Sequence, residues 1–221
     1  MIDVANACIA VIGGTGNLGA ALARRWAKAG LKVVIGSRSA QSAQAAADKL
    51  GHGLVGHSNA DAAAQADIVV VTVPFAAQEP TLADIAPHVA GKLVIDTTVP
   101  LVPPRVMRVQ LPEEGSAARR AQLLLGEGVT VAAGFHSVAA HKLATDGEVQ
   151  CDVLAFSDDK AARQTVVNLA EMAGLRGLHA GALVNATAAE ALTSILIFLN
   201  KTYKVDGAGI RITGDLIEPE S

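Results

Sequence analysis

The sequence predicts an α/β fold with a doubly wound, mostly parallel sheet and a small C-terminal helical extension. From residue 7 onward, short runs rich in valine and isoleucine alternate with alanine-rich segments of helical length. Hydrophobic residues make up 51% of the chain and aromatic residues only 3%, which suits small-residue helices packed on a buried sheet. The 221 residues fit one main core, because single cores stop growing at about 250 to 300 residues.

The alternation predicts successive strand–helix–strand units with right-handed crossovers. Strands are expected at 7–12, 32–36, 68–73, 93–96, 129–133 and 153–156, with a weak one near Leu54. Helices are expected at 17–29, 40–50, 60–66, 116–125, 160–172 and 185–199. The segment 98–114 contains four prolines and is expected to form a loop. Loops of this length in compact domains are more often functional than incidental.

Charge and composition exclude several classes of protein. The net charge is −3 and no run of lysine or arginine occurs, so we expect no nucleic-acid partner. Cys8 and Cys151 lie in expected strands and lack metal-ligand spacing, so we expect core residues and no metal site. The apolar stretch 191–199 is shorter than the ~20 residues of a membrane span. No basic and apolar leader begins the chain, so the cytoplasm and small-molecule partners are expected.

A glycine-rich turn follows the first expected strand and opens the first expected helix. Its residues match the pattern G-x-G-x-x-G and are Gly14, Thr15, Gly16, Asn17, Leu18 and Gly19. In a Rossmann-type fold the first glycine permits the tight turn, the second admits a pyrophosphate and the third lets helix and strand pack closely. Free amides at the helix start then face the anion. The alternative is an ordinary glycine turn.

The end of the second expected strand indicates which dinucleotide is bound. NAD enzymes carry an acidic residue there that binds the adenosine ribose, but this strand ends in Ser37 and Arg38. A guanidinium beside a hydroxyl suits a ribose 2′-phosphate through charge-assisted hydrogen bonds. The sequence therefore favours NADP(H) over NAD. The alternative is that Arg38 is a solvated residue at a helix start.

A further candidate lies at the end of the strand at 68–73. Val73 and Pro74 stand at the carboxyl edge of the sheet, where ligands of open α/β folds lie. Pro74 has no amide donor, so the backbone there would pack against a ligand without a competing hydrogen bond. A plain strand-ending proline is an equally economical interpretation.

Together with later motifs, these residues resemble a known family, the F420H2:NADP oxidoreductases, which are NADPH-dependent reductases of the deazaflavin coenzyme F420. The resemblance runs nearly end to end, and the combination of motifs is more specific than the glycine turn alone. Its landmarks are 12–19, Gly36-Ser37-Arg38, Val99-Pro100-Leu101-Val102-Pro103, Gly134-Phe135-His136-Ser137-Val138, Glu190-Ala191-Leu192-Thr193, Tyr203-Lys204-Val205 and 209–214.

The resemblance implies an NADP-binding Rossmann domain at 1–180 and a helical part at 181–221 that completes the acceptor site. It also implies a homodimer that moves hydride between NADP(H) and coenzyme F420. By the family pattern, Thr15, Ser37 and Arg38 hold the adenosine end of NADP, Val73 and Pro74 lie near the pyrophosphate and nicotinamide, and His136, Val138 and Thr193 face the acceptor. Two positions depart from the family: Ser42 replaces a lysine of some relatives, and Thr187 replaces an arginine of many.

Hydride transfer between two bound ring systems needs no side-chain nucleophile, because the cofactors carry the chemistry. The sequence contains no nucleophile elbow and no H-E-x-x-H motif, which agrees with this interpretation. His136 is expected to act as an auxiliary group that orients the acceptor or donates a proton, and a surface or structural histidine is the alternative. Other readings remain open: reduction of a pterin, a flavin or a small carbon substrate, or non-catalytic sensing of NADP(H).

Overall fold

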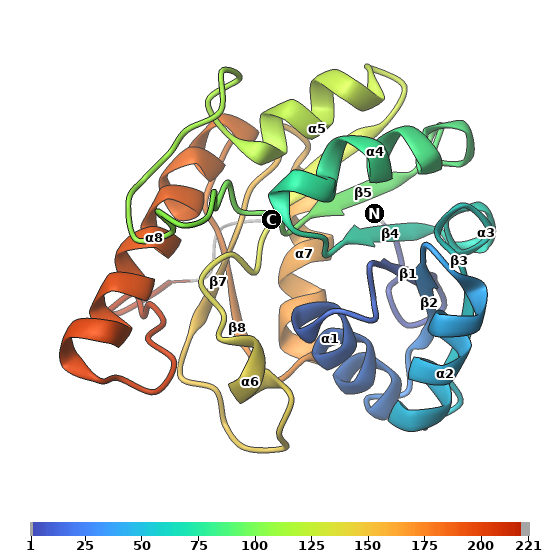
Figure 1. Ribbon diagram of the computed structural model, residues 1–221, viewed down its shortest axis with the longest axis horizontal. Helices are drawn as coiled ribbons and strands as arrows, with labels where there is room; N and C mark the ends of the chain where they lie inside the picture. Colours follow the sequence, from blue (N-terminus) through green and yellow to red (C-terminus); the bar gives the residue numbers. More distant parts are fainter. Residues whose placement is uncertain (1, 218–221) are drawn as a thin grey trace.

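The computed structural model describes residues 2–217, and its centre is one six-stranded parallel sheet (Figure 1). The strands are β1 (Cys8–Ile12), β2 (Lys32–Ser37), β3 (Val55–Ser58), β4 (Ile68–Val71), β5 (Leu93–Asp96) and β6 (Thr130–Ala133). Their order in the sheet is β3-β2-β1-β4-β5-β6. The predicted α/β, Rossmann-type sheet is confirmed. Strands β1 to β3 are added in one direction across the sheet, and β4 to β6 are added in the other direction, starting beside β1. Open α/β sheets bind ligands at this switch point, at the carboxyl ends of the strands.

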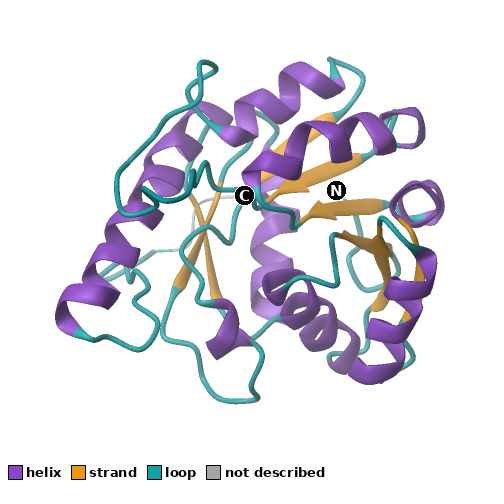
Figure 2. Cartoon of the chain, viewed as in Figure 1, coloured by secondary structure: helices purple, strands orange, loops and turns teal. Residues whose placement is uncertain are grey.

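Helices cover both faces of the sheet (Figure 2). α1 (Asn17–Lys28), α2 (Ala40–Leu50) and α7 (Lys160–Met172) enclose one hydrophobic core, and α3 (Asn59–Gln65), α4 (Phe75–Ile85) and α5 (Ala117–Leu125) enclose the other. Successive side chains of β1 alternate between the two cores, so this strand is buried on both faces. Trp26 anchors α1 to α7, because its buried Nε1 donates a 2.8 Å hydrogen bond to the carbonyl of Leu169.

Two strands form a separate small sheet. β7 (Asp152–Ala155) pairs in parallel with β8 (Arg176–His179). The strand expected at 153–156 therefore exists but does not extend the main sheet, and an antiparallel bridge between Ala133 and Phe156 links it to β6. β8 was not expected, because its sequence Arg-Gly-Leu-His has no apolar run.

The 11-residue helix α4 was also missed, as were three short elements: the 3-10 turns Ala86–His88 and Leu183–Asn185, and α6 (Ala140–Leu143). α4 contains Pro80, which normally argues against a helix, but its Leu82 and Ile85 are fully buried in the core. Burial of apolar surface thus outweighs the local preference. The proline-rich segment 98–114 contains no helix or strand, as predicted.

The last helix, α8 (Ala186–Tyr203), follows a 3-10 turn at Leu183–Asn185 and lies at the edge of the molecule (Figure 1). It is longer than the expected 185–199, and the stretch Leu183–Tyr203 is long and apolar enough to cross a membrane by length and composition. The apolar stretch 191–199 is thus part of a longer apolar helix than the sequence analysis expected. Its Glu190 is 1% exposed and hydrogen-bonded to α5, as is typical of a helix packed in a protein. The tail that follows runs along β7, where Asp152 N donates to Ile210 O at 2.8 Å.

Candidate cofactor and acceptor site

The glycine turn connects β1 directly to the end of β2. Gly14 N donates a 3.0 Å hydrogen bond to Gly36 O, and Gly16 N donates a 2.9 Å bond to Gly13 O. The residue with a left-handed backbone is Gly13, at φ +75°, and not Gly14 as expected from the motif. Position 14 has no room for a side chain, because a Cβ there would lie 2.8 Å from both Val11 O and Ile35 Cγ2.

The other two glycines have different surroundings. A Cβ on Gly19 would lie 2.4 Å from Thr72 Oγ1 and 2.9 Å from Gly14 Cα, so α1 can approach the sheet only with glycine here. A Cβ on Gly16 would lie no closer than 3.3 Å to another atom. Gly16 is exposed and is the N-cap of α1, and no side chain caps this helix. Its first amides are therefore available to an anion at the positive end of the helix dipole.

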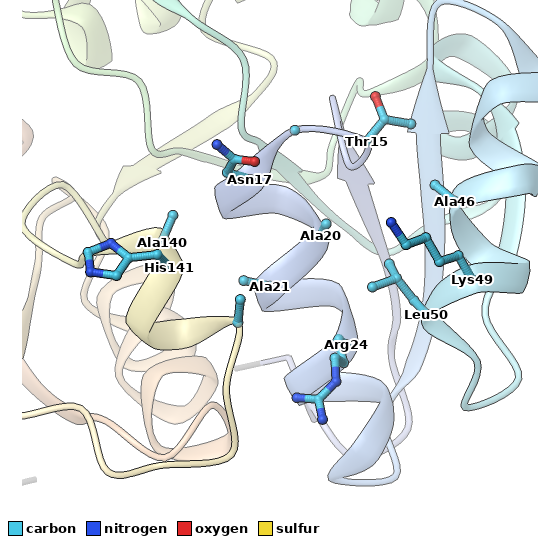
Figure 3. Close-up of a pocket in the computed structure, with 12 residues that line it drawn as sticks. Thr15, Asn17, Ala20, Ala21, Arg24, Ala46, Lys49, Leu50, Ala140 and His141 are labelled. Carbon is cyan, nitrogen blue, oxygen red and sulfur yellow. The ribbon is translucent and has the colours of Figure 1, made fainter. Parts of the chain in front are cut away.

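The remaining motif residues surround this open helix start. Thr15 and Asn17 are exposed, whereas Leu18 is half-buried and packs on the core below. A groove of about 660 Å³ begins at Thr15, Gly16 and Asn17 and runs along α1 between α2 and α6 (Figure 3). Its lining does not include the residues at the ends of β2 and β4. The groove therefore reaches the glycine turn but not the strand ends at which Ser37, Arg38, Val73 and Pro74 lie.

Ser37 and Arg38 lie at the end of β2, next to the glycine turn. Ser37 is 9% exposed and Arg38 is exposed. α2 is capped by the following residue, Ser39, whose hydroxyl accepts from Ser42 N at 3.3 Å. Arg38 precedes this cap, and among residues 2–217 its guanidinium has no hydrogen bond or ion pair. An exposed guanidinium without a protein partner beside a phosphate-binding turn fits a 2′-phosphate.

Val73 and Pro74 follow β4, which is the neighbour of β1 on the other side of the switch point. A Cβ on Gly13 would lie 2.5 Å from Val73 Cγ1, so this half-buried side chain packs directly on the turn. Pro74 is exposed and is the N-cap of α4. The structure thus brings Val73 against the glycine turn, and Pro74 follows it at the start of α4.

His136 is buried beyond the end of β6. Its side chain lies beside Phe156, with ring centroids 6.2 Å apart, and the residue is 7% exposed. Burial lowers its pKa from the ordinary value of 6.5 to about 4, so the imidazole is neutral near pH 7. Within the described part of the chain its buried Nε2 has no hydrogen-bond partner. A surface position is therefore wrong, and the hydrogen-bonding capacity of this buried ring nitrogen is unused within the described residues.

The residue before His136 has a strained backbone that the sequence did not indicate. Phe135 adopts φ +66°, a left-handed conformation that is costly for a bulky residue. Its ring is 1% exposed and meets Trp26 edge-on at 5.9 Å. This packing holds the reversal that leads the chain into His136 and Val138, and Val138 is 9% exposed.

Thr193 of α8 contacts the same segment. Its hydroxyl donates a 3.0 Å hydrogen bond to His136 O, across 57 positions of sequence. Two of the three predicted acceptor residues are therefore adjacent. Thr187, in the first turn of α8, is half-buried, and a Cβ on Gly115 would lie 4.0 Å from its Oγ1.

A buried polar cluster at the end of β5 escaped the sequence analysis. Asp96 is fully buried, its Oδ1 accepts from Thr98 N at 2.8 Å, and its Oδ2 accepts from Gln78 Nε2. Gln78 also donates to Ala117 O at 2.9 Å, which connects α4 to α5. Burial raises the pKa of Asp96, and burial raises that of Glu190 to about 8. Carboxylates separated by many residues give no local signal, so only the fold reveals the cluster.

Several known proteins are similar to this chain in sequence. The family model described as NADP oxidoreductase coenzyme F420-dependent matches residues 8–100. The F420-dependent NADP reductase of Methanothermobacter thermautotrophicus is 43% identical over 226 residues, which cover 96% of this chain and 97% of that protein. The chain belongs to the coenzyme F420-dependent NADP oxidoreductase family. The enzyme of the same name from Methanothermobacter marburgensis is 40% identical over 218 residues, covering 93% and 97%.

The fold of this family member also matches solved structures. A crystal structure from Arthrobacter sp. FB24 superimposes with a TM-score of 0.83 at 24% identity, covering 95% of this chain and all of that one. Among residues 2–217 no group of three histidine, cysteine, aspartate or glutamate side chains could hold a metal ion.

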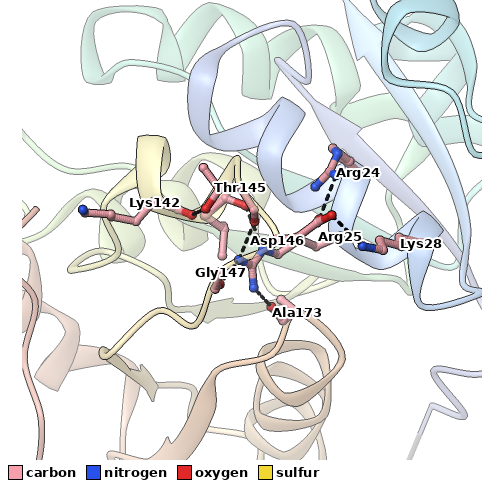
Figure 4. Close-up of polar contacts among 9 residues, drawn as sticks. Arg24, Arg25, Lys28, Lys142, Thr145, Asp146, Gly147 and Ala173 are labelled. Atoms are coloured by element: carbon pink, nitrogen blue, oxygen red, sulfur yellow. Dashed lines mark hydrogen bonds and ion pairs between the residues drawn. The ribbon is translucent and has the colours of Figure 1, made fainter.

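At its far end, α1 holds the loop that follows the His136 segment (Figure 4). The Arg25 guanidinium donates to four carbonyls, with the 2.8 Å bond to Leu143 O from Nε and the 2.7 Å bond to Ala173 O from Nη1. Nη2 donates to Thr145 O at 2.7 Å and to Gly147 O at 2.8 Å. The helix that begins at the glycine turn is thus tied at its other end to the loop beyond α6.

Proposed function

We propose that this protein transfers hydride between NADP(H) and the deazaflavin coenzyme F420. The observation that carries the proposal is the end-to-end match to reductases of that name, at 43% identity over 96% of the chain. Two observations support it: an uncapped helix start follows the glycine turn at the carboxyl edge of the sheet, and the buried Nε2 of His136 has no hydrogen-bond partner among the described residues. The bound nicotinamide supplies the hydride, and the protein aligns donor and acceptor and excludes water.

On the NADP side, the turn from Gly14 to Gly19 would hold the pyrophosphate through the uncapped amides of the first turn of α1. The exposed Arg38 guanidinium, with Ser37, would bind the ribose 2′-phosphate. The uncapped helix start and the absence of a protein partner for Arg38 among the described residues support this assignment. Val73 and Pro74 would lie under the nicotinamide half, since they adjoin the turn across the switch point.

On the acceptor side, His136, Val138 and Thr193 would form one wall of the pocket. His136 is neutral near pH 7, so one ring nitrogen donates and the other accepts. Its Nε2, which has no hydrogen-bond partner among residues 2–217, would bond to a polar atom of the acceptor ring, which would orient the ring and could relay a proton. Thr193 fixes the backbone of His136 and need not contact the acceptor itself.

The assembly is part of the same proposal. The NADP-binding part would span 1–180 and the acceptor-completing part 181–221, of which residue 1 and residues 218–221 lie outside the described residues. A homodimer is supported by apolar side chains exposed on α8 and the tail, namely Ile195, Phe198, Val205, Ile212, Leu216 and Ile217. We propose a cytoplasmic enzyme whose partners are small-molecule coenzymes, with neither nucleic acid nor membrane involved.

An anaerobic spectrophotometric screen tests the function. The purified protein is mixed with NADPH and, separately, with the deazaflavin, a free flavin and a pterin. Loss of deazaflavin absorbance, matched by NADPH oxidation, is the expected result. The reverse reaction from reduced deazaflavin and NADP is the internal control.

The other outcomes distinguish the alternatives. Reduction of only the flavin or the pterin would reassign the acceptor, and the Thr187 position would then be the first place to seek the cause. NADPH binding without turnover of any acceptor would favour a sensor. Turnover of only a small imine or carbonyl substrate would favour a small-substrate reductase.

A further inference from the structure

We infer that Glu190 is a positioning residue: its buried carboxyl fastens α8 to the N-terminus of α5 and so holds the acceptor wall in place. The identity of the acceptor in this inference rests on the proposed function. The contacts of Glu190 do not depend on it. It concerns a residue that touches neither the glycine turn nor, in the described contacts, His136.

The carboxyl of Glu190 occupies the start of α5. Its Oε2 accepts a 2.6 Å hydrogen bond from Ala117 N, and Oε1 accepts a 3.1 Å bond from Ala118 N. The Ser116 hydroxyl accepts from the next amide, Arg119 N, at 3.0 Å. The three amides of the first turn are thus satisfied, two by a side chain 72 or more positions away and one by the local cap.

Glu190 also completes a polar chain across the layers. Asp96 at the end of β5 binds Gln78 of α4, Gln78 binds Ala117 O, and Ala117 N binds Glu190. Every one of these four residues is buried, so each lost contact would leave an unsatisfied polar group. The chain therefore ties α8 to the carboxyl end of β5, on the ligand side of the sheet.

The same stretch of α8 makes the contacts that shape the acceptor side. Three residues after Glu190, Thr193 donates to His136 O at 3.0 Å, and the next residue, Ser194, donates to Arg108 O at 3.3 Å. Residues spaced by three or four lie on one helix face. If the Glu190 contact is lost, this face of α8 is no longer bonded to α5. The hydrogen bonds from α8 to the His136 segment and to the proline-rich loop should then weaken as well.

Two variants separate positioning from general destabilisation. Glu190→Ala and Ser116→Ala each leave amides of α5 without a partner, but only the first breaks the link to α8. We expect Glu190→Ala to raise the KM for the deazaflavin about tenfold or more while NADPH affinity stays within about twofold. We expect Ser116→Ala to lower the melting temperature with the deazaflavin KM within about twofold of the wild-type value. An exposed glutamate variant, Glu171→Ala, serves as the unperturbed reference.

Hydrogen exchange provides a readout that does not require turnover. Glu190→Ala should speed exchange in α8 and at residues 134–138, with the β1–α1 turn unchanged. Equal loss of NADPH and deazaflavin binding, or an unchanged deazaflavin KM with unchanged exchange in α8, would overturn the inference. If the wild-type protein does not reduce the deazaflavin, the proposed function fails, and the exchange pattern still decides the role of Glu190.

Discussion

The amide of Gly14 donates a 3.0 Å hydrogen bond to the carbonyl of Gly36, one residue before Ser37. This bond joins the loop that would receive the pyrophosphate to the strand end that would receive the 2′-phosphate. Neighbouring strands lie only about 4.8 Å apart, so the two phosphate sites belong to one crevice. Cofactor selectivity and cofactor binding can therefore be separated by substitution at adjacent positions.

Replacing Arg38 tests selectivity. Arg38→Ala should weaken NADPH binding by about 1.5 to 3 kcal/mol, the range for hydrogen bonds to charged groups, and leave NADH nearly unchanged. Titration calorimetry with both nucleotides measures this. Lys32→Ala removes an exposed cation from the opposite end of β2 and should change neither affinity. A parallel loss for both nucleotides would contradict the phosphate assignment.

The glycines of the turn should respond differently to alanine. Gly19→Ala places a methyl group 2.4 Å from Thr72 Oγ1 and 2.9 Å from Gly14 Cα, so it should destabilise the fold by about 1 to 3 kcal/mol. Gly16→Ala places its methyl group 3.3 Å from Gly13 O, a tight contact that needs only a small shift, so it should lose less stability than Gly19→Ala while NADPH affinity falls. Thermal melts and NADPH titrations of the two variants would distinguish packing from ligand approach. Normal NADPH affinity in Gly16→Ala would argue against close approach of the pyrophosphate to this glycine.

Acid should destabilise the protein through His136. Its pKa is about 4 in the folded protein and 6.5 for an ordinary histidine, so below about pH 6.5 the unfolded chain binds a proton that the folded chain does not. This contribution is fully present above pH 6.5 and is lost towards pH 4, by roughly 3 kcal/mol in all. Urea unfolding between pH 7 and 4 measures the loss. His136→Gln should flatten the profile, and the exposed His88→Gln variant should not.

Arg25 should contribute strongly to stability. Arg25→Met would leave four carbonyl acceptors without this donor, so we expect a loss of about 2 to 4 kcal/mol in the free energy of unfolding. Arg25→Lys should recover only part of it, because an ammonium lacks the planar fork. The neighbouring Arg24→Ala breaks an exposed 2.7 Å ion pair with Asp146 and should cost under about 1 kcal/mol. Similar losses for the two arginines would refute this ranking.

The contact between Thr193 and His136 can be tested without changing the size of the side chain. Thr193→Val removes the hydroxyl that donates to His136 O at 3.0 Å, so the acceptor KM should rise by about three- to tenfold. Thr193→Ser keeps the hydroxyl and should stay near the wild-type value. Steady-state kinetics with fixed NADPH would show the difference. Equal effects of valine and serine would point to packing and not to the hydrogen bond.

By itself, the sequence determined the elements whose signal is local. The glycine turn after β1, the Ser37-Arg38 strand end and the proline-rich loop are written in consecutive residues, and hydrophobic periodicity located all six strands of the main sheet, β3 only weakly. Steric and hydrogen-bonding preferences act over a few residues, so such features can be predicted from a single sequence.

Only the tertiary structure decided which distant residues meet. In the folded protein β7 pairs with β8 in a separate sheet, α4 forms despite Pro80, and Phe135 has a left-handed backbone. The tertiary structure also joined Glu190 to Ala117 across 73 positions. These outcomes depend on burial and on satisfying buried polar groups, which are properties of the assembled core and have no counterpart in local sequence.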